Sequence, residues 1–180
     1  MKNPDRFYIK PEDVEYFSTL YQILCHAAKH YPDKAAYRQI EGRNAEASFT
    51  FAEVAENTNA LRAALIEKGM AGKHMALFGE TSAQWISSYL AVVSGVGVCV
   101  PIDRELPPET IIRQLDFAET ELVFCSAKGL RKLRLALPEC KTVKTVVVMR
   151  SDSVPELENC SADVILLDEL IESAKEFAKI

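Results

Sequence analysis

The chain has 180 residues, of which 48% are apolar and 26% charged, and its net charge is −5. This composition is typical of an ordinary globular protein and excludes the clustered basic surface that nucleic-acid binding requires. Residues 1–6 have no apolar core and predict no secretory signal, and no apolar run approaches the roughly 18 residues that a membrane-spanning helix needs. The length suits one domain, residues 1–180, or one large subdomain of a bigger enzyme.

The cysteines indicate a reducing compartment. Their number is odd, no pair has the C-x-x-C spacing, and Cys99 and Cys125 fall inside apolar stretches, where a free thiol behaves as a small apolar group. We therefore expect a protein of the reduced cytoplasm. The five positions are Cys25, Cys99, Cys125, Cys140 and Cys160.

The first third of the chain predicts a helical arm, a hairpin and a long helix. Apolar residues recur at helical spacing within residues 16–31, so residues 1–34 are expected to form a helical arm that packs on the domain. Residues 35–40 and 47–51 indicate the two strands of a small hairpin. Thr50 and Glu53 then have the spacing of a capping box, which predicts a helix that ends near Gly69.

The rest of the chain alternates strands with helices. Apolar strands are expected at residues 75–78, 98–102, 121–125, 143–149 and 164–166. Helices are expected at residues 85–93, from residue 107, at residues 128–137 and at residues 168–178. This alternation of near-continuous apolar strands with helices predicts a doubly wound α/β fold, with a mostly parallel sheet covered by helices on both faces.

Polar residues that follow the predicted strands are candidates for ligand binding. Asp103 and Arg104 directly follow strand 98–102, and ligands of open α/β sheets bind outside the carboxyl ends of the strands. Residues 79–82, Gly-Glu-Thr-Ser, lie between a strand and a helix, where helix capping is favoured over anion binding. Residues 128–134 hold the densest basic patch, which predicts the solvated face of a helix.

Other motifs favour ordinary structural roles. His26 and His30 have the i, i+4 spacing of a zinc motif, but its glutamate is missing, so surface or capping histidines are expected. Gly95 and Gly97 follow a helix rather than precede one, which favours a helix end over dinucleotide binding. Residues 159–161, Asn-Cys-Ser, match the glycosylation pattern by accident in a chain without a secretory signal. The residues by themselves thus provide no catalytic set.

Three segments resemble motifs of the AMP-forming, adenylate-forming acyl-CoA synthetases, in the order and with the spacing of that family. They are residues 48–54 (SFTFAEV), similar to (S/T)-(F/Y)-x-E-L, residues 73–85 (KHMALFGETSAQW), similar to G-x-x-V-A-L-L-x-x-N-S-x-E-W, and residues 94–109 (SGVGVCVPIDRELPPE), similar to K-A-G-A-x-x-V-P-L-D-x-x-L-P-x-E. The resemblance covers roughly residues 15–150, and the long-chain fatty acid CoA ligases are most similar within the family.

The resemblance implies the N-terminal segment of an ATP-dependent acyl-CoA synthetase. In that family a carboxylate and ATP give an acyl-adenylate and pyrophosphate, and coenzyme A then displaces AMP. A carboxylic acid of the fatty type, ATP, Mg²⁺ and coenzyme A are the implied substrates and cofactors. The resemblance also implies that Arg104 contacts the phosphates of coenzyme A, and a surface network of Arg104 with Asp103 or Glu105 is the alternative.

No catalytic or metal-binding residue can be carried over from the family. Its phosphate-binding loop and later motifs do not occur before Ile180, so the chain is expected to be inactive alone and to bind none of these cofactors tightly. We expect the reading frame to continue past Ile180 into a loop rich in Ser, Thr and Gly. A face left exposed by a missing subdomain would let the chain self-associate.

Two other functions stay open on the sequence alone. The first is an adenylation domain that loads a carrier protein instead of coenzyme A. The second is a standalone, non-catalytic α/β domain for binding or regulation.

Overall fold

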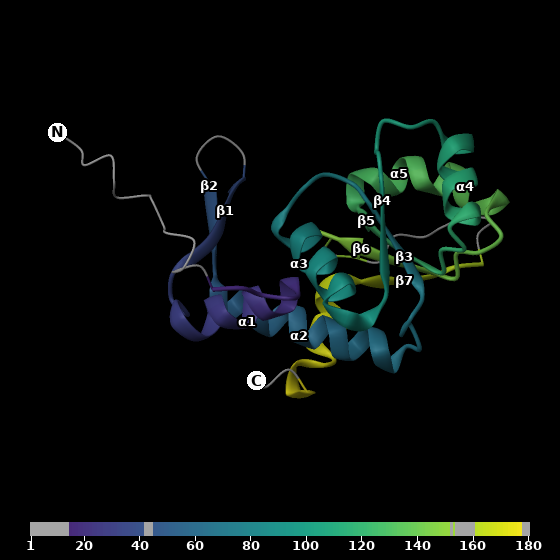
Figure 1. The fold of residues 1–180 in the computed structure, drawn as a ribbon. Coiled ribbons are helices and arrows are strands. Elements are labelled where there is room, and N and C mark those ends of the chain that lie inside the picture. Colours follow the sequence, from purple (N-terminus) through teal and green to yellow (C-terminus); the bar gives the residue numbers. More distant parts are fainter. Residues whose placement is uncertain (1–14, 42–44, 152, 154–160, 178–180) are drawn as a thin grey trace.

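A five-stranded parallel sheet with helices on both faces is the body of the protein in the computed structural model, which describes residues 15–41, 45–151, 153 and 161–177 (Figure 1). Every pairing within this sheet is parallel. The predicted doubly wound α/β fold is therefore confirmed. In spatial order, the strands are β4 (Val98–Ile102), β3 (His74–Phe78), β5 (Leu122–Ser126), β6 (Thr145–Met149) and β7 (Asp163–Leu166).

Successive residues of the central strands point to opposite faces of the sheet, and both faces are buried. Met75 and Leu77 of β3 belong to one apolar core, whereas Ala76 and Phe78 belong to the other. Burial on both faces explains why these strands are near-continuous apolar runs in the sequence. The first core is covered by α2 (Phe51–Glu67), α3 (Ala83–Ala91) and α6 (Leu167–Glu172), and the second by α4 (Pro108–Phe117), α5 (Ala127–Ala136) and the 3₁₀ turn Leu137–Glu139.

A two-stranded hairpin lies beside the sheet, as the sequence predicts (Figure 1). Its strands, β1 (Ala35–Glu41) and β2 (Ala45–Thr50), pair antiparallel. The hairpin and α1 (Leu20–His30) share a small apolar core with the start of α2, centred on Leu24 and Val54. The predicted capping box is confirmed at the start of α2, because Thr50 Oγ1 accepts from Glu53 N and the Glu53 carboxylate accepts from Thr50 N.

One π-helical turn, η3 (Val92–Val96), connects α3 to β4. Gly95 there has a φ of +95°, a conformation that favours glycine. A Cβ atom on Gly97 would lie 2.3 Å from the carbonyl oxygen of Lys73, so only glycine permits this close approach. The two glycines therefore end a helix, as their order in the sequence predicts.

The structure corrects two expectations about individual elements. The sequence indicates a buried strand at residues 98–102, but β4 is an edge strand of the described sheet and Val98 is 49% exposed. The sequence also predicts one helix from residue 168, with apolar positions up to residue 178, that runs on to Ile180, but α6 ends at Glu172 and a 3₁₀ turn, Lys175–Phe177, follows. The chain tightens here because Ala174 is fully buried and its N–H donates to the carbonyl oxygen of Ile171.

The cysteines of the described residues are free thiols at Cys25, Cys99, Cys125 and Cys140. Burial raises the pKa of Cys99 to about 11 and raises that of Cys125 further. Asn159 and Cys160 lie outside the described residues, so the glycosylation pattern is not placed. Among the helices that the structure describes, none combines the length and apolar character that crossing a membrane requires.

The strand order determines where a ligand can approach the sheet. From β3 the chain crosses to β4 on one side and then to β5 on the other side of β3. The helix that follows β3, α3, and the helix that follows β5, α5, cover opposite faces of the sheet. The loops after these two neighbouring strands therefore lead away from each other. Such a switch point leaves a crevice at the carboxyl edge, which is the usual ligand position in doubly wound sheets.

Candidate functional site

Two glycines bring the loops at the switch point close together. Gly79 directly follows β3 with a φ of +148°, and a Cβ atom on it would lie 2.8 Å from Ser126 Oγ at the end of β5. A Cβ atom on Gly129, in the first turn of α5, would lie 3.1 Å from the same oxygen and 3.3 Å from the ring of Phe78 at the end of β3. Side chains at these positions would force the two loops apart. The two glycines therefore allow close packing of these segments at the carboxyl edge.

Glu80 follows Gly79 and faces two cations, one from the loop after β4 and one from the first turn of α5. Ser126 Oγ donates a hydrogen bond of 2.6 Å to Glu80 Oε2. Glu80 Oε1 lies 3.3 Å from Arg104 Nη1 and 3.7 Å from Lys128 Nζ. These groups belong to a hollow of about 240 Å³, called the basic hollow below, which is lined by Phe78, Glu80, Arg104, Glu105, Lys128, Gly129 and Lys132.

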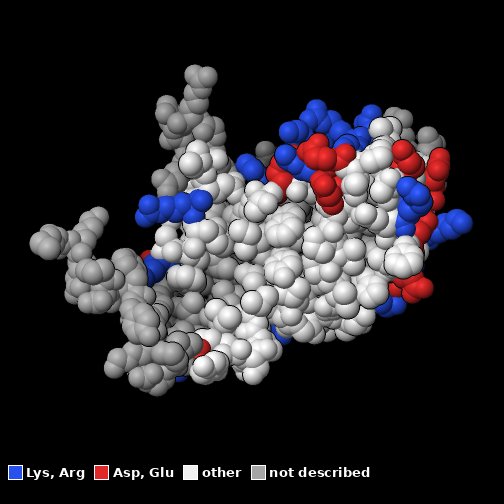
Figure 2. All heavy atoms as spheres, turned by 45° about the horizontal axis from the view of Figure 1, so that its top comes forward, with Lys and Arg blue, Asp and Glu red and all other residues white. Residues whose placement is uncertain are grey.

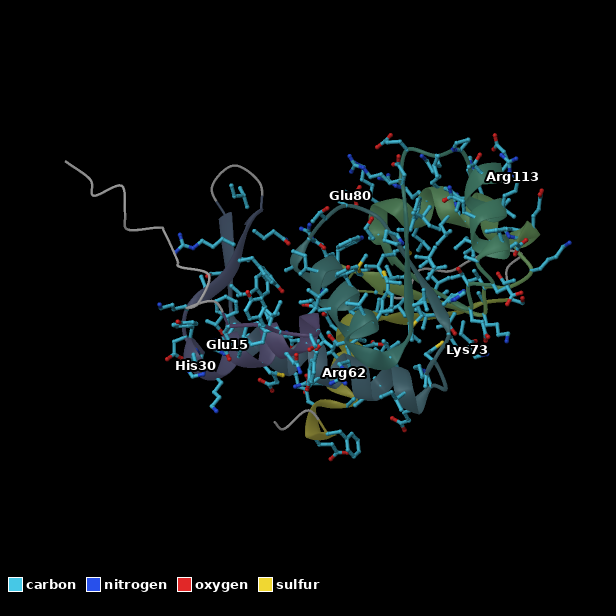
Figure 3. The ribbon with its side chains drawn as sticks, in the orientation of Figure 1. Glu15, His30, Arg62, Lys73, Glu80 and Arg113 are labelled. Atoms are coloured by element: carbon cyan, nitrogen blue, oxygen red, sulfur yellow. The ribbon has the colours of Figure 1, made fainter. Side chains whose placement is uncertain are left out.

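The figures show the place of the basic hollow on the molecule. Figure 3 labels Glu80 in the loop that leads from β3 to α3, at the carboxyl edge of the sheet. Figure 2 shows blue side chains gathered around red ones at the upper edge of the protein, which is where Figure 1 has the end of β4 and α5. Cations and carboxylates from different loops thus converge on one edge of the sheet.

Lys132 fixes the loop that carries Arg104. Its Nζ donates to the carbonyl oxygens of Arg104 at 2.6 Å and of Leu106 at 3.2 Å. Within the same loop, Glu105 N donates to Asp103 Oδ1 at 2.9 Å. The basic residues at 128–134 lie on α5 with Lys128, Arg131 and Arg134 exposed, as the sequence predicts, and Lys132 in addition binds the Arg104 loop.

Arg104, the residue to which the resemblance assigns a ligand, lies at the rim of the basic hollow. Its side chain is 48% exposed, and its Nε lies 3.0 Å from Glu105 Oε1. The expected surface network thus forms with Glu105, while Asp103 stabilises its own loop. The structure adds Glu80 as a second partner, which no local pattern in the sequence indicated. A guanidinium held between two carboxylates at the surface can exchange one of them for a phosphate group.

The charge of Glu80 is stabilised by its neighbours. The hydrogen bond from Ser126 Oγ holds the pKa of this carboxyl below its usual value, and the charges of Lys128 and Arg104 act in the same direction. Glu80 is therefore ionised at neutral pH. With three cations and two carboxylates, the basic hollow carries one excess positive charge.

A second hollow, of about 160 Å³, lies between the hairpin, α2, α3 and α6. Gln39 Oε1 accepts from Ala83 N at 2.7 Å, and the hydroxyl oxygens of Tyr37 and Ser87 lie 3.1 Å apart. Burial raises the pKa of Tyr37, so its hydroxyl stays neutral. These contacts fasten the hairpin to the first turns of α3, which gives the second hollow a structural role.

The remaining candidates of the sequence have structural roles. His26 Nδ1 lies 3.2 Å from Glu15 Oε2, and its ring centroid is 4.4 Å from that of His30. In the part of the chain that the structure describes, no three His, Cys, Asp or Glu side chains are grouped to hold a metal ion. In the segment 79–82, Ser82 Oγ accepts from Trp85 N at 3.1 Å, so the predicted helix cap is confirmed.

Solved structures of similar fold include an adenylation domain and two CoA ligases. The adenylation domain of a carboxylate reductase from Mycobacterium chelonae superposes with a TM-score of 0.74 at 16% identity, over 90% of this chain and 30% of that one. The anthranilate CoA ligase AuaEII, in complex with anthranoyl-AMP, gives 0.72 at 19% identity, over 92% of this chain and 30% of that one. A protein assigned by name as a long-chain-fatty-acid CoA ligase, from Rhodopseudomonas palustris, gives 0.69 at 18% identity, over 84% of this chain and 36% of that one. At these identities the likeness establishes the fold alone.

Curated proteins of similar sequence include peptide synthetases. Tyrocidine synthase 2 from Brevibacillus parabrevis is 31% identical over 116 residues, which are 64% of this chain and 3% of that protein. The nonribosomal peptide synthetase opaA from Aspergillus ustus is 30% identical over 100 residues, which are 55% of this chain and 2% of that protein. The chain therefore spans a very small part of these relatives.

The family follows from a match over most of the chain. The family model described as AMP-binding enzyme matches residues 24–174, which include the hairpin and the whole parallel sheet. The chain belongs to this family of adenylate-forming proteins.

Proposed function

We propose that the chain is the N-terminal part of an ATP-dependent acyl-CoA synthetase that activates a long-chain fatty acid. The basic hollow carries this proposal, because it places Arg104 and two lysines at the switch point of a scaffold that belongs to the AMP-binding enzyme family. Coenzyme A is a thiol that bears several phosphate charges, and such a hollow complements those charges. The free thiols of the described residues favour a cytoplasmic location.

The proposed reaction has two steps. A carboxylate oxygen of the acid attacks the α-phosphorus of ATP, so that an acyl-adenylate forms and pyrophosphate leaves. The sulfur of coenzyme A then attacks the acyl carbon, AMP leaves, and the thiol proton passes to solvent. We assign none of the described residues a part in holding Mg²⁺.

Within this reaction, we assign to Arg104 the role of binding a phosphate of coenzyme A. Lys132 would keep the Arg104 loop in place through its bonds to the carbonyl oxygens of Arg104 and Leu106. Both residues would act on binding of the acceptor, and we assign them no part in the adenylation step. Loss of Arg104 should therefore raise the KM for coenzyme A and leave the adenylation step intact.

The second candidate is an adenylation domain that loads a carrier protein. It is favoured by the curated relatives, since tyrocidine synthase 2 and opaA are peptide synthetases by name. The two candidates share the first step and differ in the acid and in the acceptor of the acyl group.

The test of activity uses the intact protein that contains these residues. We expect ATP–pyrophosphate exchange that depends on a long-chain fatty acid, followed by thioester formation with free coenzyme A. Exchange that depends on an amino acid, without any thioester to coenzyme A, would support the carrier-loading domain instead. Absence of exchange with every acid tested would contradict both candidates.

The test of the acceptor uses the chain itself. Calorimetric titration with coenzyme A and with dephospho-coenzyme A compares ligands that differ in one phosphate group. We expect Arg104→Ala to weaken coenzyme A binding by about tenfold, as expected for loss of one charge-assisted contact. The control is Arg134→Ala, which removes the same charge from the last turn of α5 and should leave the affinity unchanged.

A further inference from the structure

Glu80 is a carboxylate at the centre of a hollow that is otherwise suited to anions. Its Oε1 lies within 4 Å of two cationic groups, at 3.3 Å from Arg104 Nη1 and at 3.7 Å from Lys128 Nζ. A phosphate group that binds Arg104 and Lys128 together needs the same space and the same donors. The Glu80 carboxylate thus occupies the position that such a phosphate group would take.

The carboxylate of Glu80 is held in this position from behind. Its second oxygen, Oε2, accepts the 2.6 Å hydrogen bond from Ser126 Oγ, which also caps α5 by accepting from Gly129 N at 2.9 Å. Ser126 can lie at that distance because Gly79 and Gly129 have no Cβ atom that would contact its hydroxyl oxygen. Glu80 is thus anchored at one oxygen and directs the other toward the cations.

The cations, in contrast, are free to change partners. The side chains of Arg104 and Lys128 are 48% and 70% exposed. Arg104 has a further partner in Glu105, at 3.0 Å from Nε, and its loop is fixed by Lys132. Arg104 would therefore stay at the hollow if Glu80 lost its charge, with Nη1 available to a ligand.

We propose that Glu80 is an affinity-setting residue of the basic hollow, which binds a phosphate group between Arg104 and Lys128 in competition with the Glu80 carboxylate. The inference rests on the proposed function in one respect, because it takes the basic hollow to be the place where a phosphorylated acyl acceptor binds. The competition holds the affinity moderate. After acyl transfer to coenzyme A, the thioester product carries the same phosphate groups, and a moderate affinity lets it leave before the next turnover.

The experiment titrates the chain with inorganic phosphate near pH 8 and low ionic strength, where phosphate is doubly charged and screening is weak. The variant Glu80→Gln removes the negative charge and keeps an oxygen that can accept from Ser126. We expect it to bind phosphate about three- to tenfold more tightly, the range for removing one opposing charge at a solvated site. Glu121→Gln is the matched control, since it removes the same charge from between two similarly exposed lysines at the opposite edge of the sheet and should leave the affinity at the basic hollow unchanged.

Two further variants distinguish competition from a change in overall charge or fold. Arg104→Ala should lower the affinity for phosphate several-fold. In the double variant with Glu80→Gln, most of the gain seen in the single variant should disappear, because contacting residues do not act additively. An equal gain in Glu80→Gln and Glu121→Gln, or an Arg104→Ala variant that binds phosphate like the wild type, would overturn the inference. So would wild-type chain that binds no phosphate.

The outcome is separable from that of the proposed function. If phosphate binding fails while the intact protein still exchanges pyrophosphate with a fatty acid, the competition by Glu80 is wrong and the ligase stands. If phosphate binds as expected and no acid supports exchange, the ligase is wrong and the anion site stands.

Discussion

Two carboxylates, Glu80 and Glu121, lie at opposite edges of the same sheet, each between two cations. Glu121 precedes β5 at the amino edge, where its oxygens accept from Lys73 Nζ at 2.5 Å and from Lys144 Nζ at 2.8 Å. Glu80 follows β3 at the carboxyl edge, and its cations lie farther away, at 3.3 and 3.7 Å. Figure 3 labels Lys73 and Glu80 at these two ends of β3.

The difference between the two groups separates a structural ion pair from an exchangeable one. The side chain of Glu121 is 18% exposed, and hydrogen bonds from Lys144 and Lys73 lower its pKa to about 2. The side chain of Glu80 is 30% exposed, and the largest cause of its lowered pKa is the neutral hydroxyl of Ser126 rather than a cation. Lys73 and Lys144 are as exposed as the cations of Glu80, at 46% and 71%, so the two groups differ in the shorter hydrogen bonds to Glu121 and in the deeper burial of its carboxylate, which make that ion pair harder to separate.

The largest expected effect on the free energy of unfolding comes from a substitution at Gly79, which lies against Ser126 beside Glu80. Gly79→Ala would place a Cβ atom 2.8 Å from Ser126 Oγ at a φ of +148°. We expect the free energy of unfolding to fall by about 2–3 kcal/mol, from overpacking and backbone strain together. Urea denaturation measures the change.

Gly72→Ala is the control for this substitution. Gly72 also has a positive φ, +74°, but a Cβ atom there meets no atom within 4 Å. It should cost about 1 kcal/mol, from backbone strain alone. Equal losses for the two variants would mean that the contact between Gly79 and Ser126 does not matter.

The next effect concerns the structural ion pair. Glu121→Gln leaves two lysines without their carboxylate, and we expect the free energy of unfolding at pH 7 to fall by about 1–2 kcal/mol. This range is smaller than the lowered pKa suggests, because the exposed lysines are screened by solvent and salt. Urea denaturation of both proteins measures it, and an unchanged midpoint would show that Glu121 contributes nothing to the fold.

The same pair predicts a dependence of stability on pH. The folded state holds the pKa of Glu121 at about 2, below its ordinary value of 4.5. Its contribution is therefore complete above about pH 4.5 and is lost as the pH falls toward 2. The difference in unfolding free energy between wild type and Glu121→Gln should shrink over this range, as urea denaturation at several pH values would show. A difference that stays constant down to pH 2.5 would contradict the assignment.

The smallest effect is expected for Glu80. Glu80→Gln keeps an acceptor for Ser126 and removes only long, exposed ion pairs, so the free energy of unfolding should change by less than about 0.5 kcal/mol. Thermal and urea denaturation beside Glu121→Gln measure it. A loss as large as that of Glu121→Gln would mean that both carboxylates serve the fold and that their difference in geometry has no consequence.

Local sequence patterns predict the elements of this protein better than they predict its site. The apolar runs, the capping box of Thr50 and Glu53 and the glycine at 95 depend on neighbouring residues, and the structure confirms each of them. Glu80, Arg104 and Lys128 follow three different strands, and only the spatial order β4-β3-β5 brings them together. That order arises from packing between distant segments, which the spacing of residues along the chain does not reveal.

Amide chemical shifts of the ¹⁵N-labelled chain, followed during a titration with inorganic phosphate, test most directly whether the two edges of the sheet differ as we propose. We predict shifts confined to residues 79–80, 103–106 and 126–132 at the carboxyl edge, with none at Lys73, Glu121 and Lys144. Shifts of similar size at both edges, or shifts at the amino edge alone, would contradict the assignment of the basic hollow as the phosphate site.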